Sequence, residues 1–318
     1  MNGEFSLIDK YFGGRVAAPG QHTLLGIGDD AAVMSVPAGS QLVVTMDTLI
    51  GGRHFPESTH PFDIAWKSLA VNVSDLAAMA ATPFYFLLSL SLPEVDDAFL
   101  QQFSNGLFAA ADEFAIELVG GDTCRGPLSI TIQASGLVEG EQFVTRRGAK
   151  IGDKIFVSGQ LGAAALGLAH VQQKMTLTRD EQDICLNALN KPIPRTDLNE
   201  ILRLFASAAI DISDGLIADL GHILMQSRVG ALLWQGGIPL CPTVKKYHRL
   251  NDALRGGDDY QLVFTVAAQD VESMLHLAQR QSLQLFEIGE ITAKDYQLET
   301  ETGLQDCSHT GGFDHFGT

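Results

Sequence analysis

The sequence lacks the glycine-rich nucleotide loop of many phosphate-handling enzymes, because no Gly-x-x-x-x-Gly-Lys-[Ser/Thr] occurs in it. It also lacks the Gly-x-Ser-x-Gly turn of serine hydrolases and the His-Arg-Asp and Asp-Phe-Gly motifs of protein kinases. The serines are therefore poor candidates for a nucleophile, and any nucleotide would have to bind without a P-loop.

Cysteine and long apolar runs are also scarce. The four cysteines, Cys124, Cys185, Cys241 and Cys307, are far apart and form no Cys-x-x-Cys pair, which argues against a zinc site, an iron–sulfur site or a disulfide framework. The most apolar stretch, residues 84–92, is too short to span a bilayer. The N-terminus is polar and acidic, unlike a signal peptide. We therefore expect a cytoplasmic protein with no membrane partner.

Positive charge is in deficit, with 21 lysines and arginines against 38 aspartates and glutamates and a formal net charge of -17. Such a surface repels nucleic-acid backbones, so we expect no nucleic-acid partner. Part of the negative charge suits solubility, and part could be stored at cation sites, where bound ions would offset it. Aromatic residues make up only 8% of the chain, fewer than sugar sites usually use, although paired carboxylates for glycoside hydrolysis remain an alternative.

What the sequence has instead is a set of aspartates beside glycines or at the ends of apolar runs. Any one of them alone is typical of a turn, and Asp214 would also serve as a helix N-cap. Together they supply the oxygen ligands that magnesium prefers beside substrate phosphates. The segments are Gly28-Asp29-Asp30, Thr45-Met46-Asp47, Ser74-Asp75, Gly120-Gly121-Asp122, Asp211-Ile212-Ser213-Asp214-Gly215 and Gly256-Gly257-Asp258-Asp259. Phosphate transfer through several magnesium ions is the chemistry that this set favours.

The order of elements predicts an α/β (α+β) protein. Residues 42–47 are typical of a buried strand that ends on an acid, and residues 62–81 of a helix that carries Asp75. A chain of 318 residues suits one large domain or two of ordinary size. The basic, glycine-bearing segment 145–153 indicates the boundary between them, because an α/β pattern restarts after it.

We expect an N-terminal domain over residues 1–148 and a C-terminal domain over residues 149–318. Arg146, close to this boundary, could meet phosphate charge with a bidentate fork. His54 follows Asp47 after one short loop, and a role beside the cation site and no role at all are equally open for it.

At this point the motifs, in their order along the chain, resemble the thiamine-monophosphate kinase family nearly end to end. That family shares a P-loop-free ATP-binding superfamily with aminoimidazole ribonucleotide synthetase and selenophosphate synthetase. The matching segments are Gly26-Ile27-Gly28-Asp29-Asp30-Ala31-Ala32, Asp47-Thr48-Leu49, His54-Phe55, Asn72-Val73-Ser74-Asp75-Leu76-Ala77-Ala78-Met79, Val119-Gly120-Gly121-Asp122-Thr123, Asp211-Ile212-Ser213-Asp214-Gly215 and Gly312-Phe313-Asp314-His315-Phe316.

The resemblance implies a homodimer of two-domain subunits, in which the sheets of the N-terminal domains pair into a barrel-like interface. It implies that the N-terminal domain binds ATP and metal, and that the C-terminal α/β domain completes the active-site cleft. It further implies the last step of thiamine diphosphate synthesis, in which the γ-phosphate of ATP passes in line to thiamine monophosphate. A phosphate acceptor is already ionised at neutral pH, so cations matter more than a general base.

The resemblance also implies roles for individual residues. The catalytic residues would be Asp122 and Arg146, and the nucleotide would be met by Gly121, Asp122, Arg146 and Ser213. Thiamine phosphate would be met by His54, Asp258 and Phe313. Several magnesium ions would be held by Asp30, Thr45, Asp47, Asp75, Asp122, Asp211 and Asp214.

The sequence departs from the family pattern mainly on the substrate side. Asp258 and Gln261 stand where glutamates are usual, and Phe313 stands where tryptophan is usual. Met46 occupies a position where a hydroxyl residue is common. Two alternatives to the kinase therefore stay open: a catalytically weak protein that binds thiamine phosphates or nucleotides, and a related ATP-dependent enzyme with another acceptor.

Overall fold

The computed structural model describes residues 4–13 and 22–308, and its contacts divide the chain into two compact units. Unit 1 comprises Met1–Leu76 and Ala81–Gln142, and unit 2 comprises Ala77–Ala80 and Phe143–Thr318. The chain passes from the first unit to the second a little before the boundary expected at residue 148. Each unit has its own sheet, so the prediction of a mixed α/β protein with two domains is confirmed.

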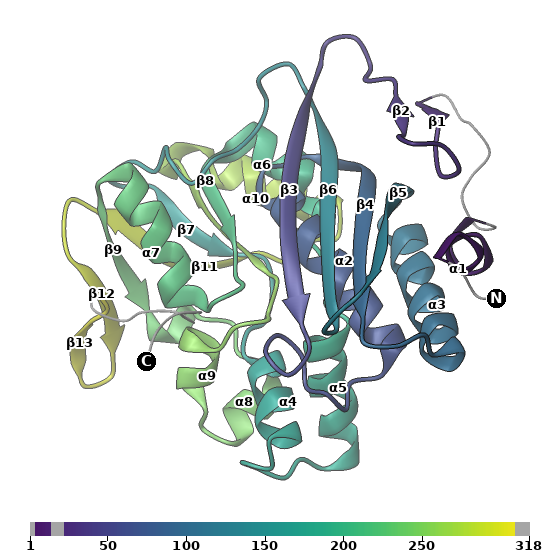
Figure 1. Cartoon of the computed structure of the whole chain (residues 1–318). Coiled ribbons are helices and arrows are strands. Elements are labelled where there is room, and N and C mark those ends of the chain that lie inside the picture. Colours follow the sequence, from purple (N-terminus) through teal and green to yellow (C-terminus); the bar gives the residue numbers. More distant parts are fainter. Residues whose placement is uncertain (1–3, 14–21, 309–318) are drawn as a thin grey trace. The chain divides into compact units, whose positions relative to one another are not determined.

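Unit 1 is built on a four-stranded sheet in the order β3-β6-β4-β5 (Figure 1). Helices α2 and α3 lie on one face of it, and α1 contacts α3 beside β5. The strands and helices are α1 (Glu4–Tyr11), β1 (Thr23–Leu25), β2 (Val33–Met34), β3 (Ser40–Ile50), α2 (Pro61–Ala78), β4 (Thr82–Leu92), α3 (Asp97–Glu113), β5 (Glu117–Arg125) and β6 (Ser129–Glu139). Asp96 is the N-cap of α3, and its side chain accepts hydrogen bonds from the backbone N–H groups of Ala98 and Phe99.

Strand β3 alternates cleanly between the two faces of this sheet, because it pairs with β6 along its whole length without a register shift. Thr45 lies opposite Ala134 and Asp47 lies opposite Ile132, and both partners are fully buried. Thr45 and Asp47 therefore face the helix-covered side. Met46, which lies between them, faces the other side.

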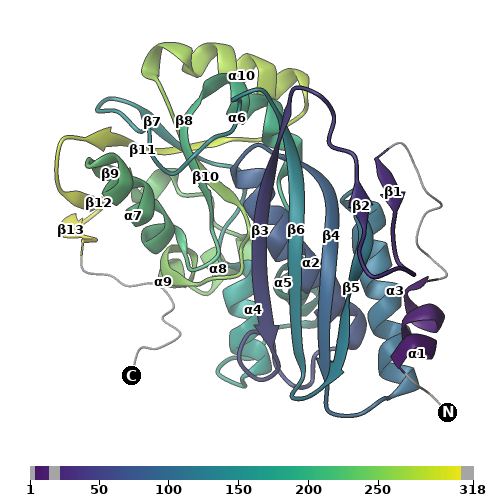
Figure 2. The ribbon, with the colours of Figure 1, turned by 45° about the horizontal axis from the view of Figure 1, so that its top comes forward.

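Unit 2 contains a seven-stranded sheet in the order β13-β12-β9-β11-β7-β10-β8 (Figure 2). Its strands are β7 (Lys154–Val157), β8 (Ala206–Asp211), β9 (Gly230–Trp234), β10 (Leu262–Val266), β11 (Phe286–Thr292), β12 (Tyr296–Thr300) and β13 (Gly303–Asp306). Its helices are α4 (Ala163–Val171), α5 (Arg179–Asn190), α6 (Asn199–Phe205), α7 (Leu216–Ser227), α8 (Pro242–Lys246), α9 (Leu250–Arg255) and α10 (Val271–Arg280).

Both faces of the central strands of unit 2 are covered by helices. On β7, Ile155 and Val157 belong to one core cluster with residues of α4, α7 and α9, whereas Phe156 belongs to a second cluster with α6 and α10. Phe156 stacks on Phe264 of β10, with ring centroids 5.8 Å apart. Strands buried on both sides carry apolar residues on both faces rather than alternating, which explains the apolar runs 155–157 and 262–264.

The expected strand end at Asp47 is wrong. Strand β3 continues past Asp47 to Ile50, because Thr48, Leu49 and Ile50 keep pairing with β6. Strand β5 passes through the glycines before Asp122 and ends at Arg125. Strand β10 begins only at Leu262, because Tyr260 has a left-handed backbone with φ 48° that no strand accommodates. Asp47 and Asp122 thus lie within strands rather than on turns.

None of the helices in the described ranges is long and apolar enough to cross a membrane. The four cysteines are free thiols, three of them buried and Cys124 exposed.

Candidate active site

In unit 1, two of the predicted site residues form a direct contact between strand β3 and helix α2. Thr45 Oγ1 donates a hydrogen bond to Asp75 Oδ2 at 2.5 Å. Asp47, two residues further along β3, faces the same side of the sheet. The three side chains are half-buried and together offer a hydroxyl and two carboxylates.

Asn72 holds Asp47 from the same helix. Its side-chain oxygen accepts the backbone N–H of Asp47 at 3.0 Å, and its amide nitrogen donates to the Ser68 carbonyl at 3.0 Å. Asn72 is fully buried, and residues three apart on a helix share one face, so Asn72 and Asp75 both reach β3. We did not predict a role for Asn72, although its place three residues before Asp75 was a usable signal.

Asp122 lies on β5, with three strand spacings between it and β3 in the order β3-β6-β4-β5. At the usual spacing this is about 14 Å between the two backbones. Gly121 before it has φ 156°, and a Cβ there would lie 1.9 Å from the Leu88 carbonyl oxygen, so only glycine fits. Asp122 pairs with Ser89 in the ladder and is exposed. The structure does not place it against the Thr45–Asp75 contact.

His54 lies in the turn that follows β3. Its Nδ1 accepts the backbone N–H of Ile50 at 3.0 Å, and the backbone N–H of His54 donates to the Ile50 carbonyl at 3.0 Å. Acceptance at Nδ1 places the proton of the neutral ring on Nε2. Asp30 is exposed in a bend, with its N–H bonded to the Asp29 carboxylate at 2.9 Å.

In unit 2, the predicted acid Asp211 lies just before the turn between β8 and α7, and Asp214 lies within it. Asp211 ends β8 and is 5% exposed, and Ser213 and Asp214 are half-buried. Asp219, in the first turn of α7, reaches back under this turn. Its Oδ2 accepts the N–H groups of Ser213, Asp214 and Gly215 at 3.0, 3.0 and 3.1 Å. Burial raises the pKa of Asp219 to about 7, and the N–H donors act in the opposite direction.

The loop that carries Asp258 lies against the turn at Ser213. The Asp258 N–H donates to the Ser213 carbonyl at 2.9 Å, and the Tyr260 N–H donates to the Ile212 carbonyl at 2.8 Å. Asp258 has φ 69°, in the left-handed region that is uncommon for residues other than glycine. The Tyr260 hydroxyl donates to Asp258 Oδ1 at 3.3 Å.

Asp259 points away from Asp258 to the start of α4. Both of its carboxylate oxygens accept the Gly162 N–H, at 3.0 and 2.9 Å. Burial raises the pKa of Asp259 to about 8, although the Gly162 hydrogen bond lowers it. This acid anchors the loop from inside unit 2.

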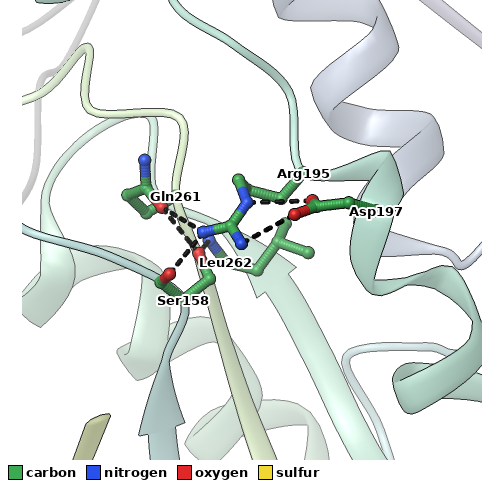
Figure 3. Close-up of polar contacts among 5 residues, drawn as sticks. All are labelled: Ser158, Arg195, Asp197, Gln261 and Leu262. Atoms are coloured by element: carbon green, nitrogen blue, oxygen red, sulfur yellow. Dashed lines mark hydrogen bonds and ion pairs between the residues drawn. The ribbon is translucent and has the colours of Figure 1, made fainter. Parts of the chain in front are cut away.

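Gln261, one of the departures from the family pattern, belongs to a polar network with Arg195 (Figure 3). Its Oε1 accepts the Ser158 hydroxyl at 2.8 Å and Arg195 Nη1 at 3.1 Å. The guanidinium also donates to the Ser158 carbonyl and forms a two-pronged ion pair with Asp197, at 2.9 Å for each prong. Ser158 Oγ in turn accepts the Leu262 N–H at 2.8 Å. Gln261 therefore joins strand β10 to the end of β7 and to Arg195.

Arg146 is exposed on the segment before β7, and its carbonyl accepts the Ser227 hydroxyl at 3.4 Å. The same hydroxyl oxygen accepts the N–H groups of Gly148 and Ala149, so α7 fixes the backbone beside Arg146. Phe313, predicted to contact the substrate, lies outside the described residues.

The donors present fit magnesium in kind. Thr45, Asp47 and Asp75 offer oxygen atoms only, and magnesium takes one or two carboxylates with the rest of its shell from phosphates and water. Within residues 4–13 and 22–308, no three histidine, cysteine, aspartate or glutamate residues gather closely enough to hold a metal alone. The set therefore suits magnesium ions whose coordination shell is completed by the phosphates of a nucleotide.

The two units together define a class of protein. The profile of AIR synthase related protein, N-terminal domain, matches residues 28–138, and that of AIR synthase related protein, C-terminal domain, matches residues 150–300. The fold alone is shared with the hydrogenase maturation protein HypE of E. coli, at 20% identity and a TM-score of 0.77 over 96% of this chain and 98% of that one.

Within this class, the chain belongs to the thiamine-monophosphate kinase family. It is 39% identical to thiamine-monophosphate kinase of Buchnera aphidicola subsp. Schizaphis graminum over 98% of both chains. It is 44% identical to that of Escherichia coli K12, over 83% of this chain and 82% of the relative.

Solved structures agree with this assignment. The crystal structure of thiamine-monophosphate kinase from Stenotrophomonas maltophilia K279a has a TM-score of 0.82 and 45% identity, over 88% of this chain and 92% of that one. The structure of AaThiL complexed with AMPPCP and TMP has a TM-score of 0.78 and 30% identity, over 99% of this chain and 97% of that one.

Proposed function

We propose that this protein transfers the γ-phosphoryl group of ATP to thiamine monophosphate, giving thiamine diphosphate and ADP. The observation that carries the proposal is the oxygen set of Thr45, Asp47 and Asp75, in a chain 39% identical to a thiamine-monophosphate kinase over 98% of both lengths. The related structure with AMPPCP and TMP pairs an ATP analogue with the acceptor proposed here.

Bound magnesium would offset the repulsion between donor and acceptor phosphates and bridge their oxygens. In unit 1, Thr45, Asp47 and Asp75 supply ligands, held by the Asn72 and Thr45 hydrogen bonds. We assign the same role to Asp30, Asp122, Asp211 and Asp214. Because these acids are distributed over several elements, more than one ion is needed to engage all of them.

The nucleotide is assigned to Gly121, Asp122, Arg146 and Ser213. Because Gly121 has no side chain, its backbone lies close to Leu88, and a phosphate would be able to approach the same backbone closely. Arg146 carries a fork-shaped guanidinium on a backbone that is tied to Ser227, which suits bidentate contact with phosphate. Asp122 and Arg146 are accordingly the residues that we propose to stabilise the transferring group.

The acceptor is assigned to His54, Asp258 and Phe313. Because His54 Nδ1 accepts the Ile50 N–H, Nε2 carries the proton that can be donated to a phosphate oxygen. Asp258 is fixed by its backbone bond to Ser213 and by the Tyr260 hydroxyl, so its shorter side chain is well oriented. Gln261 has no place in this group, because its side-chain oxygen is engaged with Ser158 and Arg195.

We further propose a homodimer built on the helix-free face of the unit 1 sheet. Large apolar side chains of β3 are exposed on that face: Leu42 is 39% exposed, Val44 57%, Met46 64% and Ile50 44%. An exposed apolar patch of this kind marks an association surface, and two such sheets facing each other would form the barrel-like interface. Free thiols and ATP as a substrate support a cytoplasmic location.

The direct test is incubation of the purified protein with ATP, magnesium and thiamine monophosphate. We expect thiamine diphosphate and ADP in equal amounts, measured by chromatography, and no diphosphate when EDTA is present. Binding of both ligands without any diphosphate would favour a catalytically weak binder. ADP formation only with a different acceptor would point to another member of the class.

A further inference from the structure

Asp219 carries an inference beyond the residues already assigned to the reaction. The turn 212–215 precedes α7, and a helix N-terminus with free N–H groups ordinarily attracts anions such as phosphate. Here the N–H groups of Ser213, Asp214 and Gly215 all point inward to a single oxygen of Asp219. Asp219 is 2% exposed, so these donors are withdrawn from solvent and from any ligand.

This arrangement determines what the turn can present. With the N–H groups of Ser213, Asp214 and Gly215 directed to Asp219, the turn presents the Ser213 hydroxyl and the Asp214 carboxylate, which are oxygen ligands for cations. A helix start that would otherwise bind an anion is thereby suited to a cation. The carboxyl group of Asp219 also lies beside the positive end of the α7 dipole and reduces its repulsion of a metal ion.

The same turn supports the loop that carries Asp258. The Ser213 carbonyl accepts the Asp258 N–H, and a Cβ on Gly257 would lie 2.3 Å from that carbonyl oxygen, so the two backbones are in direct contact. A Cβ on Gly215 would likewise lie 2.8 Å from the carbonyl carbon of Arg255. A displacement of the turn must therefore move Asp258 as well.

We propose that Asp219 is a positioning residue for phosphoryl transfer: it fixes the Ser213–Asp214 turn as a cation-binding element and, through Ser213, sets the position of Asp258. The inference rests on the proposed function. Nothing in it requires Asp219 to touch either substrate, because its carboxyl group is directed to the backbone under the turn.

The test compares Asp219→Ala with Asp219→Asn in the full-length protein, using ATP, magnesium and thiamine monophosphate. In Asp219→Ala we expect kcat to fall more than tenfold and the magnesium concentration for half-maximal rate to rise. Asp219→Asn keeps an oxygen that can accept the three N–H groups, so we expect its kcat within about threefold of wild type. Sodium formate, a carboxylate small enough for the vacated space, should restore part of the activity of Asp219→Ala.

The matched control is Asp153→Ala, which also removes a buried aspartate that accepts a backbone N–H, here from Lys150 at 2.9 Å. Asp153 bonds Ser207 at the opposite end of β8 from Asp211. We expect this variant to lose stability while its kcat, magnesium requirement and response to formate stay those of wild type.

A second variant keeps the proposal falsifiable if Asp219→Ala does not fold. Gly257→Ala adds a methyl group against the Ser213 carbonyl and leaves Asp219 intact, so we expect a raised KM for thiamine monophosphate. A folded Asp219→Ala or a Gly257→Ala with wild-type kinetic constants would overturn the positioning role. An inactive wild-type protein would instead refute the proposed function, so the two failures can be told apart.

Discussion

Thr45 Oγ1 donates a 2.5 Å hydrogen bond to Asp75 Oδ2, and this bond joins strand β3 to helix α2 in unit 1. A hydroxyl that binds one carboxylate oxygen also fixes the direction of the other carboxylate oxygen. The sequence separation of 30 residues is bridged because α2 packs on the face of the sheet toward which Thr45 points.

Replacement of Thr45 by valine removes this bond while keeping the shape of the side chain. We expect the free energy of unfolding to fall by about 1 kcal/mol and the magnesium requirement of the reaction to rise. Urea unfolding and initial rates at graded magnesium concentrations measure the two effects. Thr48→Val is the control, because Thr48 lies on the other face of β3 and loses a 2.8 Å bond to Thr131 of β6. An equal magnesium response in both variants would remove Thr45 from the metal site.

Replacement of Asn72 by alanine leaves the Asp47 N–H without its partner on α2. We expect a loss of about 1 to 3 kcal/mol in stability, because a donor in a half-buried position is left unsatisfied, together with a lower kcat. Ser68→Ala, one turn earlier, removes only a hydroxyl that bonds the Ile64 carbonyl and should keep wild-type kcat. A stable Asn72→Ala enzyme with wild-type kcat would contradict the role in orienting Asp47.

The raised pKa of Asp259 predicts a pH dependence of stability. Because the folded-state pKa is about 8 and the ordinary value is 3.8, the folded chain keeps a proton that the unfolded chain releases between these values. Stability from this group is therefore full below pH 4 and is lost as the pH rises to 8, with a slope of at most about 1.4 kcal/mol per pH unit.

The variant Asp259→Asn cannot titrate, so its stability relative to wild type should improve as the pH rises from 4 to 8. Chemical denaturation at several pH values measures this difference. A constant difference across the range would show that the carboxyl group of Asp259 does not retain a proton in the folded chain.

Replacement of Gln261 by glutamate restores the residue usual in the family. A carboxylate facing Arg195 should strengthen the bond now made by Oε1, so we expect a gain of about 1 kcal/mol in stability. The KM for thiamine monophosphate should stay unchanged, because Gln261 is engaged with β7 rather than with a substrate. A clear change of KM in Gln261→Glu would return this position to the substrate contacts.

The proposed dimer predicts that a charge on the exposed face of β3 separates the subunits. Met46→Asp places a carboxylate at a side chain that is 64% exposed, where burial on association would be costly. Sedimentation velocity should show a dimer for wild type and a monomer for this variant. Met225→Asp, which alters an equally apolar and 74% exposed residue of α7 in unit 2, should remain a dimer. A monomeric wild type would refute the dimer itself.

Much of the framework could be predicted from apolar patterns. The strand around Asp47 and the helix that carries Asp75 are both present, because local periodicity determines them. Asp122 was expected on a turn, since paired glycines usually interrupt strands. Strand β5 continues there because Gly121 fits its backbone against Leu88, a contact from another strand that no local pattern reports.

The roles of Asp219 and Gln261 could not be predicted for a similar reason. Three N–H groups converge on Asp219 only after the turn 212–215 has folded back over α7. Gln261 stands in a motif whose neighbours suggested substrate contact, yet its side chain meets Arg195 and Ser158, which are distant in sequence. Spacing along the chain reports helix faces and strand faces, but not the partners brought by other segments.

The bond from the Asp47 N–H to Asn72 has a consequence for the edge of the sheet. Strand β3 is an outer strand of eleven residues, and a long uncovered edge is a template on which foreign strands can add and aggregates can grow. A strand that approached this edge would find the donor of Asp47 already occupied by the side chain from α2. The side-chain amide of Asn72 that holds the Asp47 backbone thus also interrupts the ladder by which one sheet could continue into the next.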